Sequence, residues 1–230
     1  MTERDKILGR IREGLRMPAP HPGAHGAVAE PEPPTHGRPV EEAQRWLPAG
    51  GETFEEQVEH FRAASAELKT DFHLLASREE ALARLGAIRD ADGWKKIATH
   101  HGKLTGDIGV SLKLPVLPTD GGYDVNELES CDAGITECDA LVAQTGSVII
   151  TNRSAGGRAL SVLPPHHVVL ARREQLLRDL TEGLALVQRK YAGNYPSMIS
   201  LVTGPSRTGD IERILVLGAH GPKKLTVLLW

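Results

Sequence analysis

Hydrophobic residues along this chain recur with two different periods, one typical of helices and one of strands. Over residues 3–16 they return every three or four positions, which predicts a short amphipathic helix. Two further helices are predicted to begin at Thr53 and Ser77, each followed three positions later by a glutamate. This spacing is the capping box, which satisfies free backbone N–H groups at a helix start. A longer helix is predicted over residues 173–191, where the apolar side chains form one stripe.

Short apolar runs predict the strands. They cover residues 72–76, 94–98, 140–143, 147–151, 167–171, 197–202 and 225–230. Strands and helices alternate through most of the chain. This order predicts an α/β fold with a mostly parallel sheet and helices on both faces. Residues 102–124, rich in Gly, Pro and Asp, predict long loops with short elements, and such loops often form a functional surface.

The composition changes between the first helix and the α/β region. Residues 17–39 are dense in Pro, Gly and His and contain almost no apolar residues. Such a segment cannot bury enough surface to offset the entropy of ordering it. We therefore predict three parts, which are a helix over residues 1–16, a flexible linker over residues 17–52 and an α/β domain over residues 53–230.

Charge and cysteine content narrow the classes of function. The chain has 230 residues and a formal net charge of −3, without a lysine- or arginine-rich tract, so no nucleic-acid partner is expected. Its 2 cysteines, Cys131 and Cys138, give no disulfide framework and no ligand set for an iron–sulfur cluster. No apolar run is long enough to span a membrane, and the first residues do not resemble a signal peptide. These features predict a cytoplasmic protein.

Several common catalytic motifs are absent from the sequence. The chain contains no G-x-G-x-x-G, G-x-S-x-G, H-E-x-x-H or C-x-x-C pattern. The adjacent pairs His100–His101 and His166–His167 are poor metal ligands, because neighbours on a strand point to opposite faces. We therefore expect neither a metal nor a cofactor.

Three loops follow predicted strands, and ligands of open α/β sheets bind beyond the carboxyl ends of strands. The first loop consists of Gln144, Thr145, Gly146 and Ser147. Its glycine lies between hydroxyl residues and would let backbone N–H groups approach an anion closely. The same four residues also fit a tight hairpin between two short strands.

The second loop presents Arg158 after two glycines. The planar guanidinium of an arginine can grip a carboxylate or a phosphate from two sides. A solvated surface arginine fits this position equally well.

The third loop begins with Gly204 and has the G-x4-G spacing of a phosphate-binding P-loop, but Asp210 stands where that loop requires lysine. Ser206 or Thr208 is predicted to cap a short helix that runs to residue 217. Free N–H groups at that helix start, together with Arg207, suggest a site for a small carboxylate or monophosphate.

His220 follows this predicted helix. At neutral pH its imidazole could serve as a general acid or base, or it could hydrogen-bond within its own turn. The sequence offers no identifiable partner that would favour the catalytic role.

Five motifs together resemble those of one known family. They are Gly134-Ile-Thr136, then Ala143-Gln-Thr-Gly-Ser147, then Gly157-Arg158 with Ser161-Val-Leu-Pro164, then Gly204-Pro-Ser-Arg-Thr208 with Asp210-Ile-Glu212, and finally Gly218-Ala-His-Gly-Pro222. In this order they are similar to the lactate utilization protein C family, also called the LUD domain family. The resemblance covers residues 54–230.

The resemblance implies a Rossmann-like fold similar to the sugar-phosphate isomerase and CoA-transferase group. It also implies a part in oxidising L-lactate to pyruvate together with separate iron–sulfur subunits. This chain would be the non-redox component, which binds a small carboxylate or phosphate or organises its partners.

The alternative is a stand-alone isomerase or CoA-transferase acting on a phosphorylated or CoA substrate. That chemistry needs a carboxylate in the pocket. Gln144 stands where the family usually has glutamate, and Glu137 is the substitute that the sequence offers.

Overall fold

The computed structural model describes residues 3–14, 48–208, 216–218 and 220–230 of the chain. It divides into two units, one ending at Trp46 and one beginning at Leu47. The first contains α1, Glu3–Gly14, the helix predicted from the apolar spacing. Most of the predicted linker lies outside the described residues. None of the helices in the described part is long and apolar enough to cross a membrane.

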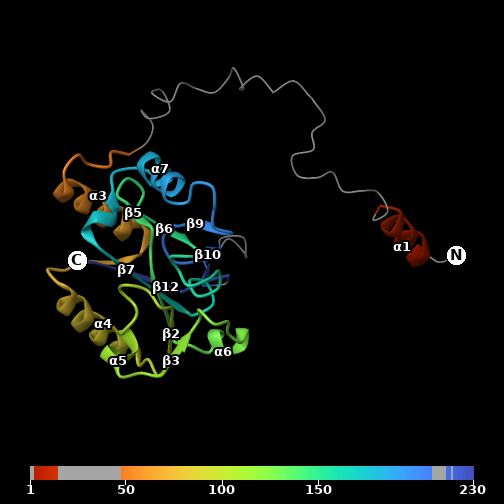
Figure 1. The fold of residues 1–230 in the computed structure, drawn as a ribbon, viewed down its shortest axis with the longest axis horizontal. Coiled ribbons are helices and arrows are strands. Elements are labelled where there is room, and N and C mark those ends of the chain that lie inside the picture. Colours follow the sequence, from red (N-terminus) through yellow and green to blue (C-terminus); the bar gives the residue numbers. More distant parts are fainter. Residues whose placement is uncertain (1–2, 15–47, 209–215, 219) are drawn as a thin grey trace, which may run out of the picture. The chain divides into compact units, whose positions relative to one another are not determined.

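A six-stranded sheet forms the centre of the second unit (Figure 1). In spatial order its strands are β1 (Asp71–Leu74), β12 (Lys224–Leu229), β7 (His166–Ala171), β4 (Ala133–Glu137), β2 (Ile97–Thr99) and β3 (Val116–Pro118). All five neighbouring pairs are parallel. The prediction of an α/β fold with a mostly parallel sheet is therefore confirmed, and the fold is Rossmann-like.

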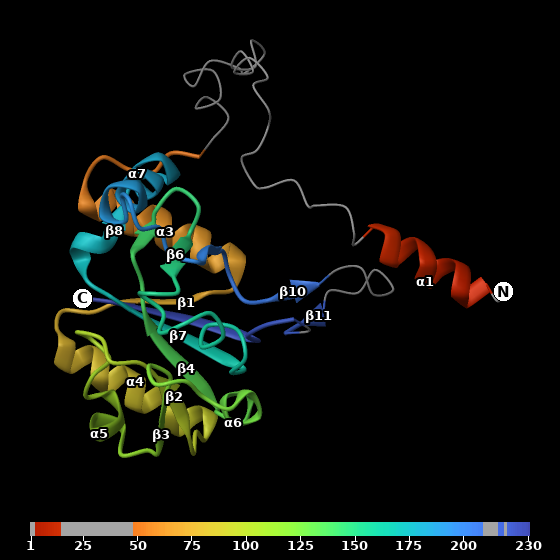
Figure 2. The same cartoon turned by 45° about the vertical axis from the view of Figure 1, so that its right-hand side comes forward.

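Both faces of this sheet are buried, as continuous apolar strands require. Along β7, Val168 and Leu170 pack against α4 (Arg78–Asp92) and α5 (Ile108–Leu112), while Val169 lies in the core on the opposite face. Figure 2 shows α4 and α5 on one side of the strands and α3 on the other. A short helix, α6 (Val125–Glu129), contributes Leu128 to a smaller apolar cluster.

A second sheet of four strands covers the face opposite α4. Its order is β8 (Leu176–Leu177), β5 (Ala140–Val142), β6 (Ser147–Thr151) and β9 (Ile199–Val202). The strand β6 runs antiparallel to both of its neighbours, β5 and β9. The predicted strands are real, but the sequence did not reveal that they form a separate layer. On this face the sequence predicts helices alone, whereas the structure has the second sheet and α3.

Two helices complete the layers around the second sheet. The helix α3, Phe54–Leu68, packs Phe61 into the core between the sheets and begins with the predicted capping box of Thr53 and Glu56. The helix α7, Leu180–Lys190, packs against the outer face of β5 and β6 through Val187.

The long helix predicted over residues 173–191 is wrong in its first third. A 3₁₀ turn, η1 (Arg173–Gln175), comes first, then β8, whose leucines pair with β5. Asp179 then starts α7, because its side chain accepts a hydrogen bond from the N–H of Glu182 at 2.9 Å. A good cap and an available sheet edge together outweigh the helical spacing.

The predicted helix ending at residue 217 is wrong at both of its ends. The strands β10 (Arg207–Thr208) and β11 (Val216–Leu217) pair antiparallel as a two-stranded ribbon. The intervening part of that prediction lies outside the described residues.

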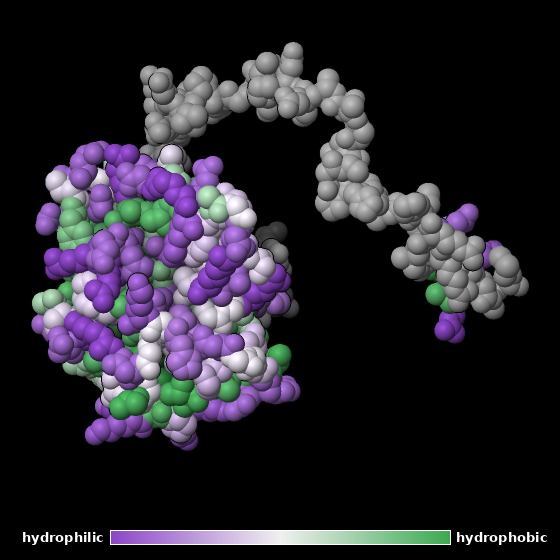
Figure 3. Space-filling view, viewed as in Figure 1, coloured by the Kyte–Doolittle hydropathy of each residue, from purple (hydrophilic) through white to green (hydrophobic). Residues whose placement is uncertain are grey.

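Hydrophilic residues cover most of the face of the α/β domain seen in Figure 3, with hydrophobic residues between them in small patches. Among the described residues, the most exposed large hydrophobic one, Val110, is 82% exposed. Single apolar residues of this kind are normal on a protein surface.

A buried histidine in the central sheet makes stability depend on pH. His167 is wholly buried and shares a hydrogen bond of 2.9 Å with Thr136, and burial lowers its pKa to about 3. An unfolded histidine takes up a proton below about pH 6.5, so this residue's contribution to stability is complete above that pH and is lost as the pH falls toward the folded pKa.

We expect the variant His167→Gln to reduce the acid sensitivity of folding. Between pH 7.5 and pH 5 the wild-type protein should lose about 2 kcal/mol more free energy of unfolding than the variant. Urea unfolding at the two pH values measures this difference. Equal losses in both proteins would contradict it.

Candidate functional site

The first predicted loop is a tight hairpin packed on α3. Gly146 has φ of +63°, and a Cβ at this position would lie 2.9 Å from the Cβ of Ala64. Thr145 Oγ1 donates to Ser147 Oγ at 2.8 Å, and Ser147 Oγ shares a hydrogen bond of 2.8 Å with Thr203 Oγ1. The hydroxyl groups of this loop are therefore engaged with one another and with Thr203, the residue before the third loop.

Gln144 has a clear local role. Its Nε2 donates to the carbonyl of Pro48 at 2.9 Å, and its Oε1 accepts from the N–H of Leu180 at 3.5 Å. The amide thus ties the segment before α3 to the start of α7. A glutamate could accept from Leu180, but its ionised carboxylate could not donate to Pro48.

The third loop lies beside the segment that contains His220. The N–H of Ser206 donates to the carbonyl of Pro222, and the N–H of Gly218 donates to the carbonyl of Ser206, each at 2.9 Å. Gly204, with φ of +85°, approaches the backbone of Leu68 at the end of α3.

Several side chains of this loop and its neighbour lie at the surface, whereas Pro205 is buried. Arg207 and His220 are exposed, and Thr208 is half-buried. The first and third loops and residue 220 therefore belong to one region of the molecule.

Arg158 lies elsewhere. Its guanidinium donates to the hydroxyl and the carbonyl of Ser197, at 3.3 and 3.1 Å. Ser197 precedes β9 near the Thr151 end of β6, whereas Ser147 begins β6. Four strand steps at about 3.3 Å each separate these ends. None of the ten sequence candidates lines a cavity described below, so a shared pocket for them remains a prediction.

A crevice of about 690 Å³ opens at the carboxyl ends of the parallel strands. From β2 the chain continues outward to β3 and then returns to β4 on the opposite side of β2. Such a reversal is the topological switch point at which open α/β sheets bind ligands. The crevice is lined by His100–Leu104 after β2, by Glu137 and Cys138 at the end of β4, and by Arg153, Ser154, Arg172, Glu174, Gln175, Lys190 and Tyr191. We call it the β2–β4 crevice.

A buried carboxylate lies behind one wall of the β2–β4 crevice. The side chain of Asp139 is 0% exposed and accepts hydrogen bonds from Lys190 Nζ, Tyr191 Oη and Ser154 Oγ, each at 2.6 Å. Burial by itself would raise the pKa of Asp139, but these three donors hold that pKa below its ordinary value. The network fixes α7 against the loop after β6.

The other wall is built around a histidine and a glutamate. The N–H of Glu137 donates to His100 Nε2 at 3.3 Å, so this ring nitrogen carries no proton. Burial also lowers the pKa of His100, which favours the neutral imidazole. Glu137 Oε1 accepts from the N–H of Leu104 at 2.6 Å. The neutral imidazole of His100 and the carboxylate of Glu137 thus both belong to residues that line the crevice at the switch point.

Cations outnumber carboxylates around the β2–β4 crevice. Lys190 is paired with Asp139, and Arg153 donates to Asn194 Oδ1 at 2.8 Å. Within the part of the chain that the structure describes, Lys103 and Arg172 have no carboxylate partner. Their positive charge can attract an anion to the crevice.

The candidate residues of the three loops that the sequence singles out do not line this crevice. From the sequence, His100 is weighed as a metal ligand and Glu137 as a substitute carboxylate. His100 directly follows β2, and Glu137 is the last residue of β4. A titratable side chain at the carboxyl end of an apolar strand is a signal that the sequence contains. Asp139 and Lys190 lie far apart in sequence, and only the fold brings them together.

Comparison with known proteins identifies a domain in the second half of the chain. Residues 118–230 match the LUD domain. This range contains β4, β7 and β12 of the central sheet and the whole second sheet, whereas His100 and the rest of its loop precede it.

Curated relatives carry the name lactate utilization protein C. The protein from Deinococcus radiodurans is 35% identical over 121 residues, which are 52% of this chain and 56% of that protein. The one from Anoxybacillus flavithermus is 33% identical over 111 residues, 48% of this chain and 49% of that protein. The chain thus spans about half the length of the curated relatives that it matches.

A solved structure shares the fold. The crystal structure of a DUF162 family protein from Deinococcus radiodurans superposes with a TM-score of 0.58 and 21% identity, covering 78% of this chain and 99% of that one. Residues 118–230 are thus similar to the LUD domain and to the lactate utilization protein C relatives, and the likeness to the solved structure shows a shared fold.

Proposed function

We propose that this chain acts in lactate utilization and binds a carboxylate in the β2–β4 crevice. The observation that supports this most directly is the pair Lys103 and Arg172, which line the crevice at the switch point and have no carboxylate partner in the described part of the chain. Lactate and pyruvate each carry one carboxylate, and an arginine fork can hold it from two sides. The name of the curated relatives supports the choice of substrate.

Under this proposal the chain is the non-redox component of an iron–sulfur-dependent system that oxidises L-lactate. Separate iron–sulfur subunits would carry the electrons, and this chain would hold the carboxylate or organise those subunits. Affinity purification from cells grown on L-lactate tests the partnership. Recovery of the chain without any iron–sulfur protein would contradict it.

We expect Arg172→Gln to weaken binding of L-lactate or pyruvate about tenfold, because the loss of one charge-assisted contact removes about 1.4 kcal/mol. Isothermal titration of the full chain measures the dissociation constants. Arg158→Gln is the matched control, since Arg158 contacts Ser197 and does not line the crevice.

The opposite pattern would overturn this assignment of the site. It would show weakened binding in the Arg158 variant and unchanged binding in the Arg172 variant. Growth on L-lactate of a strain that carries each variant in place of the wild-type gene then tests whether binding matters to the cell.

A second candidate function is transfer chemistry on a phosphorylated or CoA substrate. The observation that favours it is Glu137, a carboxylate in a crevice of about 690 Å³, which lies in the range that holds ligands much larger than a three-carbon acid. Thermal-shift measurements with lactate, pyruvate, sugar phosphates and CoA compounds separate the two candidates. Stabilisation by CoA compounds alone would favour the second.

A further inference from the structure

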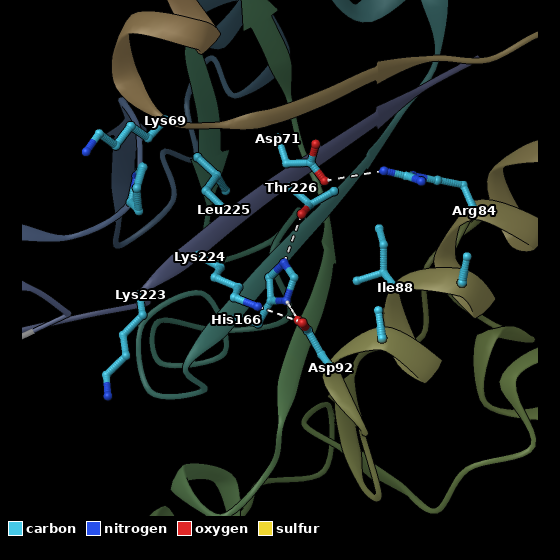
Figure 4. A pocket seen from close by; sticks show the side chains of 13 residues that line it. Lys69, Asp71, Arg84, Ile88, Asp92, His166, Lys223, Lys224, Leu225 and Thr226 are labelled. Atoms are coloured by element: carbon cyan, nitrogen blue, oxygen red, sulfur yellow. Dashed lines mark hydrogen bonds and ion pairs between the residues drawn. The ribbon is translucent and has the colours of Figure 1, made fainter.

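A second cavity, of about 450 Å³, lies at the other end of the strands of the central sheet, away from the β2–β4 crevice (Figure 4). The first residues of three parallel strands contribute to it, namely Asp71 of β1, His166 of β7 and Lys224 of β12. The carboxyl-terminal half of α4 forms the facing wall. We call it the α4 cavity. Because it lies at the amino ends of the strands, it is distinct from the β2–β4 crevice.

Much of the lining of the α4 cavity is apolar. Ala87, Ile88 and Ala91 present the face of α4, while Leu225 and Pro205 complete the apolar surface. Pro205 belongs to the third loop of the sequence analysis, so that loop borders this cavity although its arginine does not line it. An apolar surface with a few convergent polar groups is typical of sites for small organic molecules.

The carboxylates of the α4 cavity are already engaged. Asp92 Oδ1 accepts from Lys224 Nζ at 2.6 Å, and Asp92 Oδ2 lies 3.1 Å from His166 Nδ1. Asp71 lies 2.9 Å from His73 Nε2 and 4.0 Å from Arg84 NH2. Figure 4 shows the contacts of Asp92 with Lys224 and His166, and that of Asp71 with Arg84.

Two cations of the same cavity remain without such partners. Lys69 and Lys223 line its rim, and neither has a carboxylate partner among the described residues. Together with Arg84 and Lys224, they give the lining four cations against the two carboxylates Asp71 and Asp92. The imidazole of His166 is held between Asp92 and Thr226 Oγ1, the latter at 2.9 Å. The charge of the rim therefore suits an anion.

The backbone at Lys69 adds an independent observation. This residue follows α3 with φ of +63°, in the left-handed region that favours glycine. A lysine here carries a conformational strain that glycine would relieve. Lys113 takes the same conformation after α5, with φ of +53°, but does not line the α4 cavity. Backbone strain of this kind is often kept where a side chain serves a function.

We propose that the α4 cavity binds an organic anion with an apolar body, whose carboxylate or phosphate group pairs with Lys69 and Lys223 while the body packs against α4. The proposal is independent of the carboxylate site in the β2–β4 crevice. It assigns a ligand class to a region that includes part of the third loop.

Titration of the full chain with hexanoate, followed by ¹⁵N-resolved NMR, tests the ligand class. We expect hexanoate to shift the amide signals of residues that line the α4 cavity, and acetate and hexanamide to do so much more weakly. Hexyl phosphate in a parallel titration distinguishes a phosphate from a carboxylate head group. Absence of shifts at the cavity with both hexanoate and hexyl phosphate, or equal binding of hexanamide, would overturn the proposal.

Two matched variants test the role of Lys69. Lys69→Gly and Lys113→Gly should both raise the midpoint of thermal unfolding, by about 2 °C, because each relieves left-handed backbone strain. Only Lys69→Gly should also weaken hexanoate binding, about fivefold. If the two variants bind hexanoate equally well, Lys69 is not part of the site and the proposal fails.

Discussion

Replacing Asp139 with alanine is expected to reduce the free energy of unfolding by about 3 kcal/mol, since it breaks a buried charge network and leaves its donors unpaired. Tyr191, 6% exposed, would lose its carboxylate acceptor, as would Ser154. Lys190 is half exposed and can turn toward water, which keeps the loss at the lower end of the range for buried pairs.

The comparison with Asp90→Ala tests this interpretation. Asp90 pairs with Arg89 on the surface of α4 and is 68% exposed, so its loss should change the free energy of unfolding by less than about 1 kcal/mol. Urea unfolding followed by circular dichroism measures both variants. Similar small losses in the two would show that the Asp139 network contributes no more than a surface pair.

The same network predicts a second pH window for stability. Because the folded pKa of Asp139 is lowered, its stabilisation is present above the unfolded pKa of about 3.9 and is lost as the pH falls through the folded pKa. The difference between the wild-type protein and Asp139→Ala should therefore shrink in strong acid. This window opens at a lower pH than that of His167, near pH 3.9 instead of near pH 6.5.

Phe61→Ala is expected to have an effect at least as large, a loss of about 3–5 kcal/mol. The ring of Phe61 is 0% exposed and meets that of Phe72 edge-on, with centroids 4.8 Å apart. It fills the core between α3, the second sheet and β1, and alanine would leave a cavity there.

Val110→Ala is the control for this large-to-small change. Val110 is 82% exposed, and its truncation should alter the free energy of unfolding by no more than about 0.5 kcal/mol. A loss below about 1 kcal/mol for Phe61→Ala would mean that α3 is not packed as described.

The periodic parts of the sequence predicted the elements well because their signals are local. Apolar runs identified β1, β2, β7 and β12 of the central sheet but not β3 and β4, and the pairing of Thr53 with Glu56 located the start of α3. Leu176 and Leu177 were misread because their spacing also fits a helix, while a free edge of β5 was available to pair with them. Secondary structure that depends on a distant partner cannot be read from local spacing.

The candidate site was less predictable for the same reason. The fold brings Asp139 of the second-sheet layer to Lys190 at the end of α7, and His100 to Glu137 across the switch point. Each pair joins residues that are far apart in sequence, and no spacing rule connects them. By contrast, the sequence singles out Thr145 and Ser147 because they flank Gly146, and their hydroxyl groups bond to each other.

The position of β12 between β1 and β7 has a consequence for folding kinetics. Asp71 is paired with Thr226, so nearly the whole domain lies between these two partners in sequence. Closing so long a loop delays the completion of a parallel sheet. Until β12 is in place, β1 and β7 each present an unpaired edge on which another chain could add a strand. The step most exposed to aggregation is therefore the insertion of the final strand into the middle of the sheet.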